Sequence, residues 1–243
     1  MYDMNDSSFQ SSRLIAIVGP TCVGKSKITQ KLIESFPVEV INLDSFMIYY
    51  HFSIGTGRND VSLYRRHLYG FLNPMENLTA EDYIRLVDTA ILDISKRGNI
   101  PIFEGGSLTY LRFLNEAYKL LIVGILPEND KIIEENIEIR LDDNLSRNIL
   151  EEVQEGLKLG YRNSRVLKDD VVYLPLVEFL DGKLTLDDVR LRIKNNLNKM
   201  VKNQMDGYKN FNIQWVQFND AFHSLSNLIS SYKFVKENLN TNQ

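Results

Sequence analysis

Cysteine is almost absent from this chain of 243 residues, which contains only Cys22. A single cysteine excludes a disulfide within the chain and a metal site built from several cysteines. Residues 1–13 are polar and acidic, whereas a secretion signal begins basic and continues apolar. No apolar run approaches the roughly 20 residues that a membrane-spanning helix needs. The sequence therefore predicts a cytoplasmic protein without a membrane partner.

A strong charge imbalance is also missing, because the formal net charge is only -4. Such a chain has no global attraction for nucleic-acid phosphates, so a polyanionic partner requires a local basic patch. Hydrophobic residues make up 44% and charged residues 25% of the chain, a balance that excludes a disordered or fibrous protein. The composition favours a compact, enzyme-sized unit, and phosphorylated small molecules remain possible ligands.

Short apolar runs alternate with helical patterns through the first half of the chain. Continuous apolar runs of this length are typical of strands that are buried on both faces of a parallel sheet. The alternation predicts a doubly wound α/β fold. The expected strands are 14–18, 38–43, 99–103 and 120–126; the helices between them are 25–36, 80–97 and 108–114; residues 45–78 are expected to be loop with short helix.

The second half of the sequence is mostly helical. Apolar residues recur at helical spacing from 131 to 159 and again from 186 to 208, with an irregular stretch between them. An alternating segment at 213–218 predicts a final strand, and a last helix is expected at about 221–237. We interpret residues 1–12 as a loose tail and 13–243 as a single domain, within which about 127–212 form a helical subdomain.

A phosphate-binding loop follows the first expected strand. Its sequence matches the pattern G-x-x-x-x-G-K-[ST], and it lies between an apolar strand and a helix, as that pattern requires. Backbone N–H groups of such a loop surround a phosphate, the lysine adds a cation, and the hydroxyl can bind Mg²⁺. The fold is therefore predicted to be a P-loop NTPase-like parallel sheet flanked by helices, with a helical C-terminal part. The loop residues are Gly19, Pro20, Thr21, Cys22, Val23, Gly24, Lys25 and Ser26.

Two carboxylates follow expected strands. Asp44 comes directly after the second strand, and Glu104 ends the third. The carboxyl ends of adjacent parallel strands open onto the same crevice, so both should lie near the phosphate loop. Asp44 is a candidate general base or water-mediated Mg²⁺ partner, and it is equally interpretable as a turn residue. Glu104 is a candidate for the acidic residue of a nucleotide hydrolase or kinase.

The order of these segments resembles the isopentenyltransferases, a family that attaches a five-carbon prenyl group to the exocyclic amine of adenine. The resemblance covers most of the chain, and its blocks are specific only in their order and spacing. The blocks are Gly19-Pro20-Thr21 with Lys25-Ser26; Asn42-Leu43-Asp44-Ser45 with Tyr49 and Ile54-Gly55-Thr56-Gly57-Arg58; and residues 67–111, which include Glu104-Gly105-Gly106-Ser107.

This resemblance implies a donor, a cofactor and a set of site residues. The donor is dimethylallyl diphosphate, or its hydroxylated relative, with Mg²⁺ on Ser26. Asp44 is implied as the base that removes a proton from the amine, with Thr21 as a second catalytic residue. The implied diphosphate-binding residues are Gly19, Pro20, Cys22, Val23, Gly24, Lys25, Ser26 and Arg140, and the acceptor-binding residues are Ser45, Arg58, Gly105 and Ser107.

The acceptor is expected to be a free adenine nucleotide. Members of the family that modify tRNA carry a long helical insertion after the glycine pair, whereas the expected strand at 120–126 follows almost at once here. The chain therefore resembles the short bacterial enzymes that prenylate AMP in cytokinin synthesis, and the acidic net charge agrees. We expect AMP as the acceptor and no tRNA partner; the oligomeric state is left open.

Two departures from the family pattern keep other hypotheses open. Met47 stands where the family has a glutamine, and a thioether does not form the hydrogen bonds of an amide. The family's glycine-tyrosine-arginine is missing from residues 170–174, although Arg162 or Arg165 could supply the arginine. The alternatives are a P-loop small-molecule kinase or nucleotide hydrolase, a non-catalytic nucleotide-binding protein, and a shortened tRNA-modifying enzyme.

Overall fold

The computed structural model describes residues 14–58 and 65–232. Its centre is a parallel sheet with strand order β3-β2-β4-β1-β5-β6. The sheet confirms the predicted α/β class. Its strands are β1 (Leu14–Val18), β2 (Val38–Asn42), β3 (Arg66–His67), β4 (Ile100–Glu104), β5 (Leu120–Leu126) and β6 (Ile213–Gln217).

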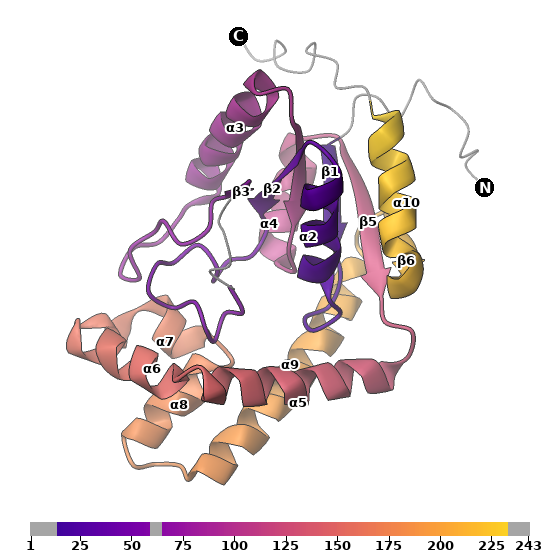
Figure 1. Cartoon of the computed structure of the whole chain (residues 1–243). Coiled ribbons are helices and arrows are strands. Elements are labelled where there is room, and N and C mark those ends of the chain that lie inside the picture. Colours follow the sequence, from indigo (N-terminus) through magenta and orange to yellow (C-terminus); the bar gives the residue numbers. More distant parts are fainter. Residues whose placement is uncertain (1–13, 59–64, 233–243) are drawn as a thin grey trace.

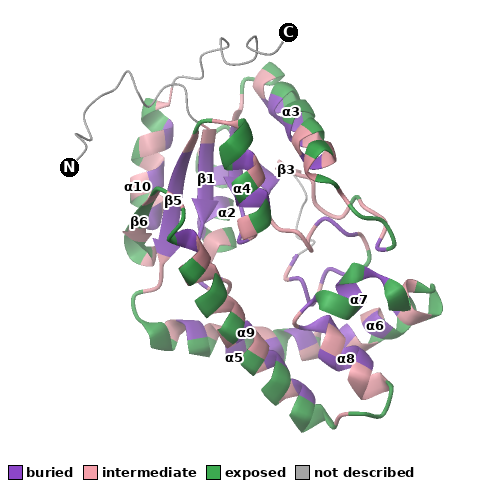
Figure 2. Cartoon of the chain, turned by 180° about the vertical axis from the view of Figure 1, so that it is seen from behind, coloured by how far each residue is buried: buried purple, intermediate pink, exposed green. Residues whose placement is uncertain are grey.

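Helices cover both faces of the sheet (Figure 1). Helices α2 (Lys25–Ser35) and α10 (Phe218–Ser231) contact each other on one face, and α3 (Ala80–Lys96) and α4 (Leu108–Ala117) contact each other on the other. Seen from behind, the strands between them are largely buried (Figure 2). This double cover explains why β1 is a continuous apolar run and why every residue of β2 is buried, including its two polar residues Glu39 and Asn42.

The remaining helices gather beyond the carboxyl ends of the strands, at the bottom of Figure 1. Helix α5 passes below the sheet, and α9 rises from this layer toward α4. The layer therefore faces the edge of the sheet where ligands bind in open α/β folds. It consists of α5 (Asp130–Ser146), α6 (Ile149–Lys158), the 3₁₀ turn Tyr161–Asn163, α7 (Arg165–Asp169), α8 (Tyr173–Leu180) and α9 (Leu186–Tyr208).

Local signals determine where several helices begin. Thr79 accepts a hydrogen bond from the Asp82 N–H at the start of α3, as the sequence predicts. Thr185 and Asp188 form a reciprocal capping box at the start of α9. Figure 2 shows exposed residues on the outer sides of these helices, so their buried stripes face the sheet or one another.

Some expected elements differ from the structure. The helix expected at 131–159 is two helices, because Asn148 adopts a left-handed conformation with φ of 60° between α5 and α6. The stretch expected to be irregular contains α7 and α8, and residues 45–78 contribute β3 to the sheet. The final strand at β6 is confirmed. The last helix, expected at about 221–237, begins earlier, at Phe218, and ends at Ser231. The tail predicted at 1–12 and the expected helical residues 233–237 lie outside the described residues.

Candidate active site

The phosphate loop connects β1 to α2 and depends on two glycines. A Cβ on Gly19 would lie 2.7 Å from the Ile125 carbonyl oxygen. Gly24 has a φ of +97°, and a Cβ there would lie 2.6 Å from the Phe218 ring. The loop leads directly into the N-terminus of α2, where the first N–H groups have no intrahelical partners. This is a geometry that binds anions.

Lys25 folds back onto the loop. Its Nζ donates to the carbonyl oxygens of Gly19 at 2.9 Å and Pro20 at 3.0 Å. Desolvation lowers the pKa of Lys25, and the negative charges of Glu104 and Asp44 oppose this shift. The cation therefore lies between the loop and the two carboxylates that the sequence singled out.

Glu104, at the end of β4, is buried and fully engaged. Its Oε1 accepts from Ser26 Oγ at 2.7 Å, and its Oε2 accepts from Thr29 Oγ1 at 2.9 Å and Arg66 Nη1 at 3.1 Å. Because three donors surround it, Glu104 connects the sheet to the phosphate loop and orients the exposed Ser26 hydroxyl. The arrangement gives Glu104 a positioning role and leaves it poorly placed to accept a proton.

Asp44 follows β2 and uses only one carboxylate oxygen in a turn. Its Oδ1 accepts from the N–H groups of Phe46 at 2.8 Å and Met47 at 3.2 Å. Among residues 14–58 and 65–232, no donor binds Oδ2. The turn interpretation of Asp44 is therefore confirmed. Its second carboxylate oxygen is available to a ligand, and a role as base or Mg²⁺ partner stays a prediction.

Arg140 reaches from helix α5 to the phosphate loop. Its Nη1 donates to Thr21 Oγ1 at 3.2 Å, and its Nη2 donates to the Gly55 carbonyl at 2.7 Å. A Cβ on Gly57 would lie 3.2 Å from Nη2, so a glycine leaves room for the guanidinium. The structure therefore places Arg140 in contact with Thr21 of the phosphate loop, and the binding of a diphosphate by Arg140 stays a prediction.

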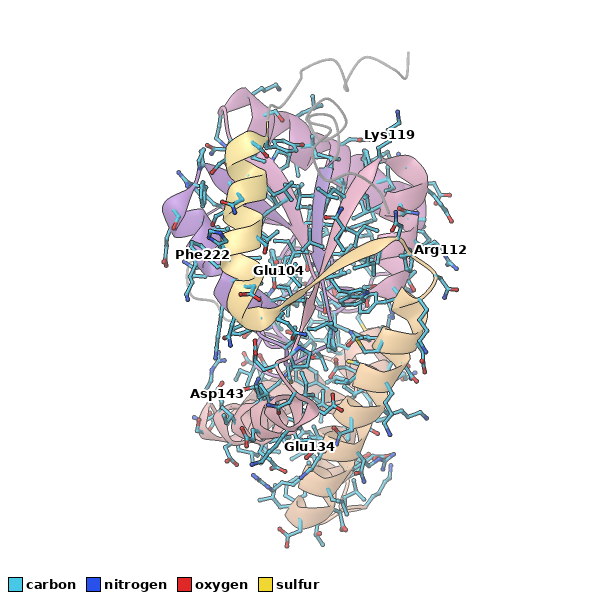
Figure 3. The ribbon with its side chains drawn as sticks, turned by 90° about the vertical axis from the view of Figure 1, so that its right-hand side faces the viewer. Glu104, Arg112, Lys119, Glu134, Asp143 and Phe222 are labelled. Carbon is cyan, nitrogen blue, oxygen red and sulfur yellow. The ribbon has the colours of Figure 1, made fainter. Side chains whose placement is uncertain are left out.

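These groups surround one cavity of about 410 Å³ between the sheet and the helical layer. Figure 3 labels Glu104 at the end of the sheet and Asp143 on helix α5 below it, and both line the cavity. The expected site residues that line it are Thr21, Cys22, Gly24, Lys25, Ser26, Asp44, Gly105 and Arg140. The others, which do not, are Gly19, Pro20, Val23, Ser45, Arg58 and Ser107.

Several residues expected to bind the acceptor have structural partners. Ser107 is the N-cap of α4 and accepts from the Tyr110 N–H at 3.3 Å. Arg58 is buried and donates to the Tyr49 carbonyl at 3.0 Å. Ser45 lies outside the cavity wall, whereas Gly105 lies within it, where a Cβ would meet the Leu43 carbonyl oxygen at 2.1 Å.

The two arginines considered as replacements occupy different surroundings. Arg162 pairs with Asp181 at the surface, with an Nη2 to Oδ1 distance of 2.9 Å. Arg165 lies over the ring of Phe46, 5.0 Å from its centroid, and that ring lines the cavity. Neither Arg162 nor Arg165 lines the cavity. Arg140 does line it, and its guanidinium contacts the phosphate loop.

Sequence reasoning missed several polar residues in the cavity wall, among them Asn144, Asp170 and Gln204. Asn144 lies one helical turn after Arg140, a spacing that could have revealed it once Arg140 was proposed. Asp170 begins the segment in which the family arginine was sought. For Gln204 no sequence signal exists, because it is one of several polar residues in a long helix.

Comparisons with known proteins agree on a family. The profile described as IPP transferase matches residues 47–119 and 114–210, two segments that overlap at the end of α4 and its short connection to β5. A tRNA dimethylallyltransferase 2 from Geotalea daltonii is 25% identical, over 93% of this chain and 94% of that protein.

Two solved structures share the fold. A tRNA isopentenylpyrophosphate transferase from Staphylococcus epidermidis has a TM-score of 0.79 at 19% identity, covering 90% of this chain and 99% of that one. A full-length enzyme of the same name from Bacillus halodurans has a TM-score of 0.76 at 21% identity, covering 90% of this chain and 96% of that one. The shared fold is consistent with the predicted P-loop type.

These findings correct the expected acceptor. The relatives that match nearly the whole chain are named for tRNA, so the expectations of AMP as acceptor, of tRNA as an unlikely partner and of closeness to the cytokinin enzymes are wrong. A kinase or hydrolase is not favoured either. The error arose because the prediction used a missing insertion and the net charge, whereas the similarity to the tRNA-named relatives extends over nearly the whole chain. The chain belongs to the IPP transferase family.

Proposed function

We propose that this protein transfers a dimethylallyl group from dimethylallyl diphosphate to the exocyclic amine of an adenosine in tRNA. Relatives over nearly the whole chain length are named tRNA dimethylallyltransferases, which supports the reaction and the acceptor class. The observation that carries the proposal is the placement of the phosphate loop, Arg140 and Asp44 around one cavity. An anion site and a carboxylate that face each other suit a reaction in which a diphosphate leaves and an amine attacks.

The donor diphosphate is assigned to the phosphate loop. Negative charge grows on the diphosphate as the allylic C–O bond breaks, so cations there stabilise the transition state more than the ground state. Lys25 and Arg140 both reach the loop, and the α2 N-terminus adds its backbone N–H groups. Thr21, which accepts from Arg140, lies where the leaving oxygen would be held.

Asp44 is assigned the role of the base that accepts a proton from the adenine amine. The adenine amine is a weak nucleophile, because its lone pair is delocalised into the ring. As the nitrogen lone pair forms a bond to the allylic carbon, the C–O bond breaks and the electron pair leaves with the diphosphate. The surplus amine proton passes to Asp44 Oδ2, the oxygen left out of the turn.

The residues around Ser26 fit a magnesium ion. Mg²⁺ is usually held by one or two protein oxygens together with substrate phosphates and water. The Ser26 hydroxyl is exposed at the cavity and oriented by Glu104, and it provides one such oxygen beside the loop. When bound, the ion would neutralise charge on the leaving diphosphate.

The test is a direct assay. The purified protein is incubated with Mg²⁺, dimethylallyl diphosphate and unmodified tRNA, and nucleosides from the digested tRNA are analysed by mass spectrometry. We expect prenylated adenosine from tRNA, none from a parallel reaction with AMP, and none from tRNA when EDTA replaces Mg²⁺. Product from AMP alone, or ATP hydrolysis without any prenylated product, would overturn the proposal.

A further inference from the structure

The cavity contains a buried amide that the proposed chemistry does not use. Asn144 on helix α5 lines the cavity and is only 4% exposed. Its Nδ2 has no hydrogen-bond partner in the described parts of the chain. Buried polar groups are nearly always paired, because an unpaired donor keeps the full cost of losing its water. An orphan donor in a cavity wall therefore indicates a ligand group that accepts from it.

The position of Asn144 relates it to the reacting groups. It follows Arg140 by one helical turn, so both side chains lie on the face of α5 that borders the cavity. Arg140 points to the phosphate loop. Asn144 thus faces the part of the cavity that lies one turn further along the helix.

Met47 lines the same cavity three residues after Asp44. A glutamine is expected at this position from the family resemblance, and methionine cannot replace its amide as a hydrogen-bond donor. The chain therefore lacks an amide at 47 and has an unpartnered amide at 144 in the wall of one cavity.

Asp170 restricts what the Asn144 amide can bind. This carboxylate is 5% exposed, lines the cavity, and accepts at Oδ1 from the N–H groups of Val172 at 2.8 Å and Tyr173 at 3.1 Å. Desolvation raises the pKa of Asp170 to about 6. A phosphate placed beside this carboxylate would be disfavoured, whereas a neutral group with a hydrogen-bond acceptor would not.

We propose that Asn144 is a specificity-determining residue that binds the acceptor base, its Nδ2 donating to a ring nitrogen of adenine in place of the amide missing at Met47. Asparagine amides pair with adenine through its exocyclic amine and a ring nitrogen. This inference rests on the proposed function, because it identifies how the same site selects its acceptor.

The test compares acceptors that differ by one ring nitrogen. The tRNA substrate is prepared with adenosine, 1-deazaadenosine or 7-deazaadenosine at the prenylated position, and kcat/KM is measured for the wild type and Asn144→Leu. We expect the wild type to be about 10-fold or more slower with one of the two analogues. Asn144→Leu should be about 10- to 100-fold slower with adenosine, should not lose activity further with that analogue, and should keep the wild-type KM for the donor.

Two further variants separate recognition from structure. The double variant Met47→Gln/Asn144→Leu restores an amide to the cavity at position 47. It should recover part of the activity with adenosine that Asn144→Leu loses. Asn136→Leu is the matched control, because Asn136 lies on the same helix and cavity wall, but its Nδ2 already donates to the Cys22 carbonyl at 2.9 Å. It should raise the KM for the donor and keep the wild-type response to both analogues.

The outcomes are distinguishable. If Asn144→Leu keeps the wild-type activity, or keeps the same response to the analogues, the inference is wrong. If it instead changes the preference between dimethylallyl diphosphate and the hydroxylated donor, the amide binds the donor, and the inference is also wrong. If the wild type does not prenylate adenosine in tRNA at all, the proposed function fails, and the inference fails with it.

Discussion

Gln204 accepts a hydrogen bond from the Thr21 N–H at 2.8 Å, although 183 residues separate them. Its Nε2 donates to the Gly106 carbonyl at 3.0 Å, so one side chain of α9 joins the phosphate loop to the turn after β4. One turn further along α9, the buried Tyr208 hydroxyl donates to the Gly19 carbonyl at 3.0 Å. The shape of the loop therefore depends on a helix from the far end of the chain.

Replacing this link should weaken donor binding. Gln204→Leu removes both hydrogen bonds at about the same volume, and we expect a roughly 10-fold higher KM for dimethylallyl diphosphate, since each lost bond is worth about 1 kcal/mol. Steady-state kinetics measures this, with circular dichroism to confirm the fold. An unchanged KM in Gln204→Leu would show that the loop holds its shape without α9.

The sequence predicts those parts of this structure whose cause is local. Strand β1 is a continuous apolar run, Thr79 caps its own helix, and the phosphate loop has a fixed spacing of glycines and a lysine. Asp44 and Glu104 could be assigned to the cavity because both stand at the carboxyl ends of parallel strands.

The rest depends on pairing between distant segments. Strand β3 has only two residues, so it exists through its pairing with β2 and shows no pattern of its own. Helix α8 is apolar on nearly all sides and has Pro175 in its first turn, which hides the helical period. The partners of Gln204, and the orphan amide of Asn144, are visible only once the helical layer is packed against the sheet.

The assignment of Asp44 as base predicts a large loss of turnover in Asp44→Asn. The amide oxygen can still accept from Phe46 and Met47, so the turn should survive, but the variant cannot take up the amine proton. We expect kcat to fall by about 10²- to 10⁴-fold with little change in melting temperature. Asp143→Asn is the control, because Asp143 lines the same cavity and pairs with Arg147 at 3.6 Å. Near-normal turnover in Asp44→Asn would remove Asp44 from the mechanism.

A buried carboxylate away from the cavity predicts an acid-sensitive fold. Burial alone would raise the pKa of Glu39, but hydrogen bonds from Arg97, Asn99 and His67 outweigh it and lower the pKa to about 2. A carboxylate whose pKa is lower in the folded protein stabilises the fold at pH values above its ordinary pKa of 4.5. This stabilisation is lost as the pH falls from 4.5 toward 2.

Glu39→Gln should therefore lower the free energy of unfolding by about 1 to 3 kcal/mol at pH 7, and the difference should shrink as the pH approaches 2. Urea unfolding of both proteins across this range measures it. Asp82→Asn, which removes an exposed ion pair with Arg85, should cost much less. A Glu39→Gln deficit that is the same at every pH would mean that packing, rather than charge, accounts for the effect.

Asp170 predicts the opposite dependence on pH. Its pKa is raised by desolvation to about 6 from an ordinary value of 3.8, so the folded protein binds more protons than the unfolded chain between these values. The free energy of unfolding should fall as the pH rises through this window, and the full destabilisation by the buried charge should be present above pH 6.

Asp170→Asn keeps an oxygen for the Val172 and Tyr173 N–H groups and removes the buried charge. We expect it to be about 1 to 3 kcal/mol more stable than the wild type at pH 7.5 and no more stable at pH 3.5, measured by urea unfolding. Asp170→Ala, which also loses the oxygen at the start of α8, should lack this gain; if Asp170→Asn gave equal gains at both pH values, the buried charge would not be their source.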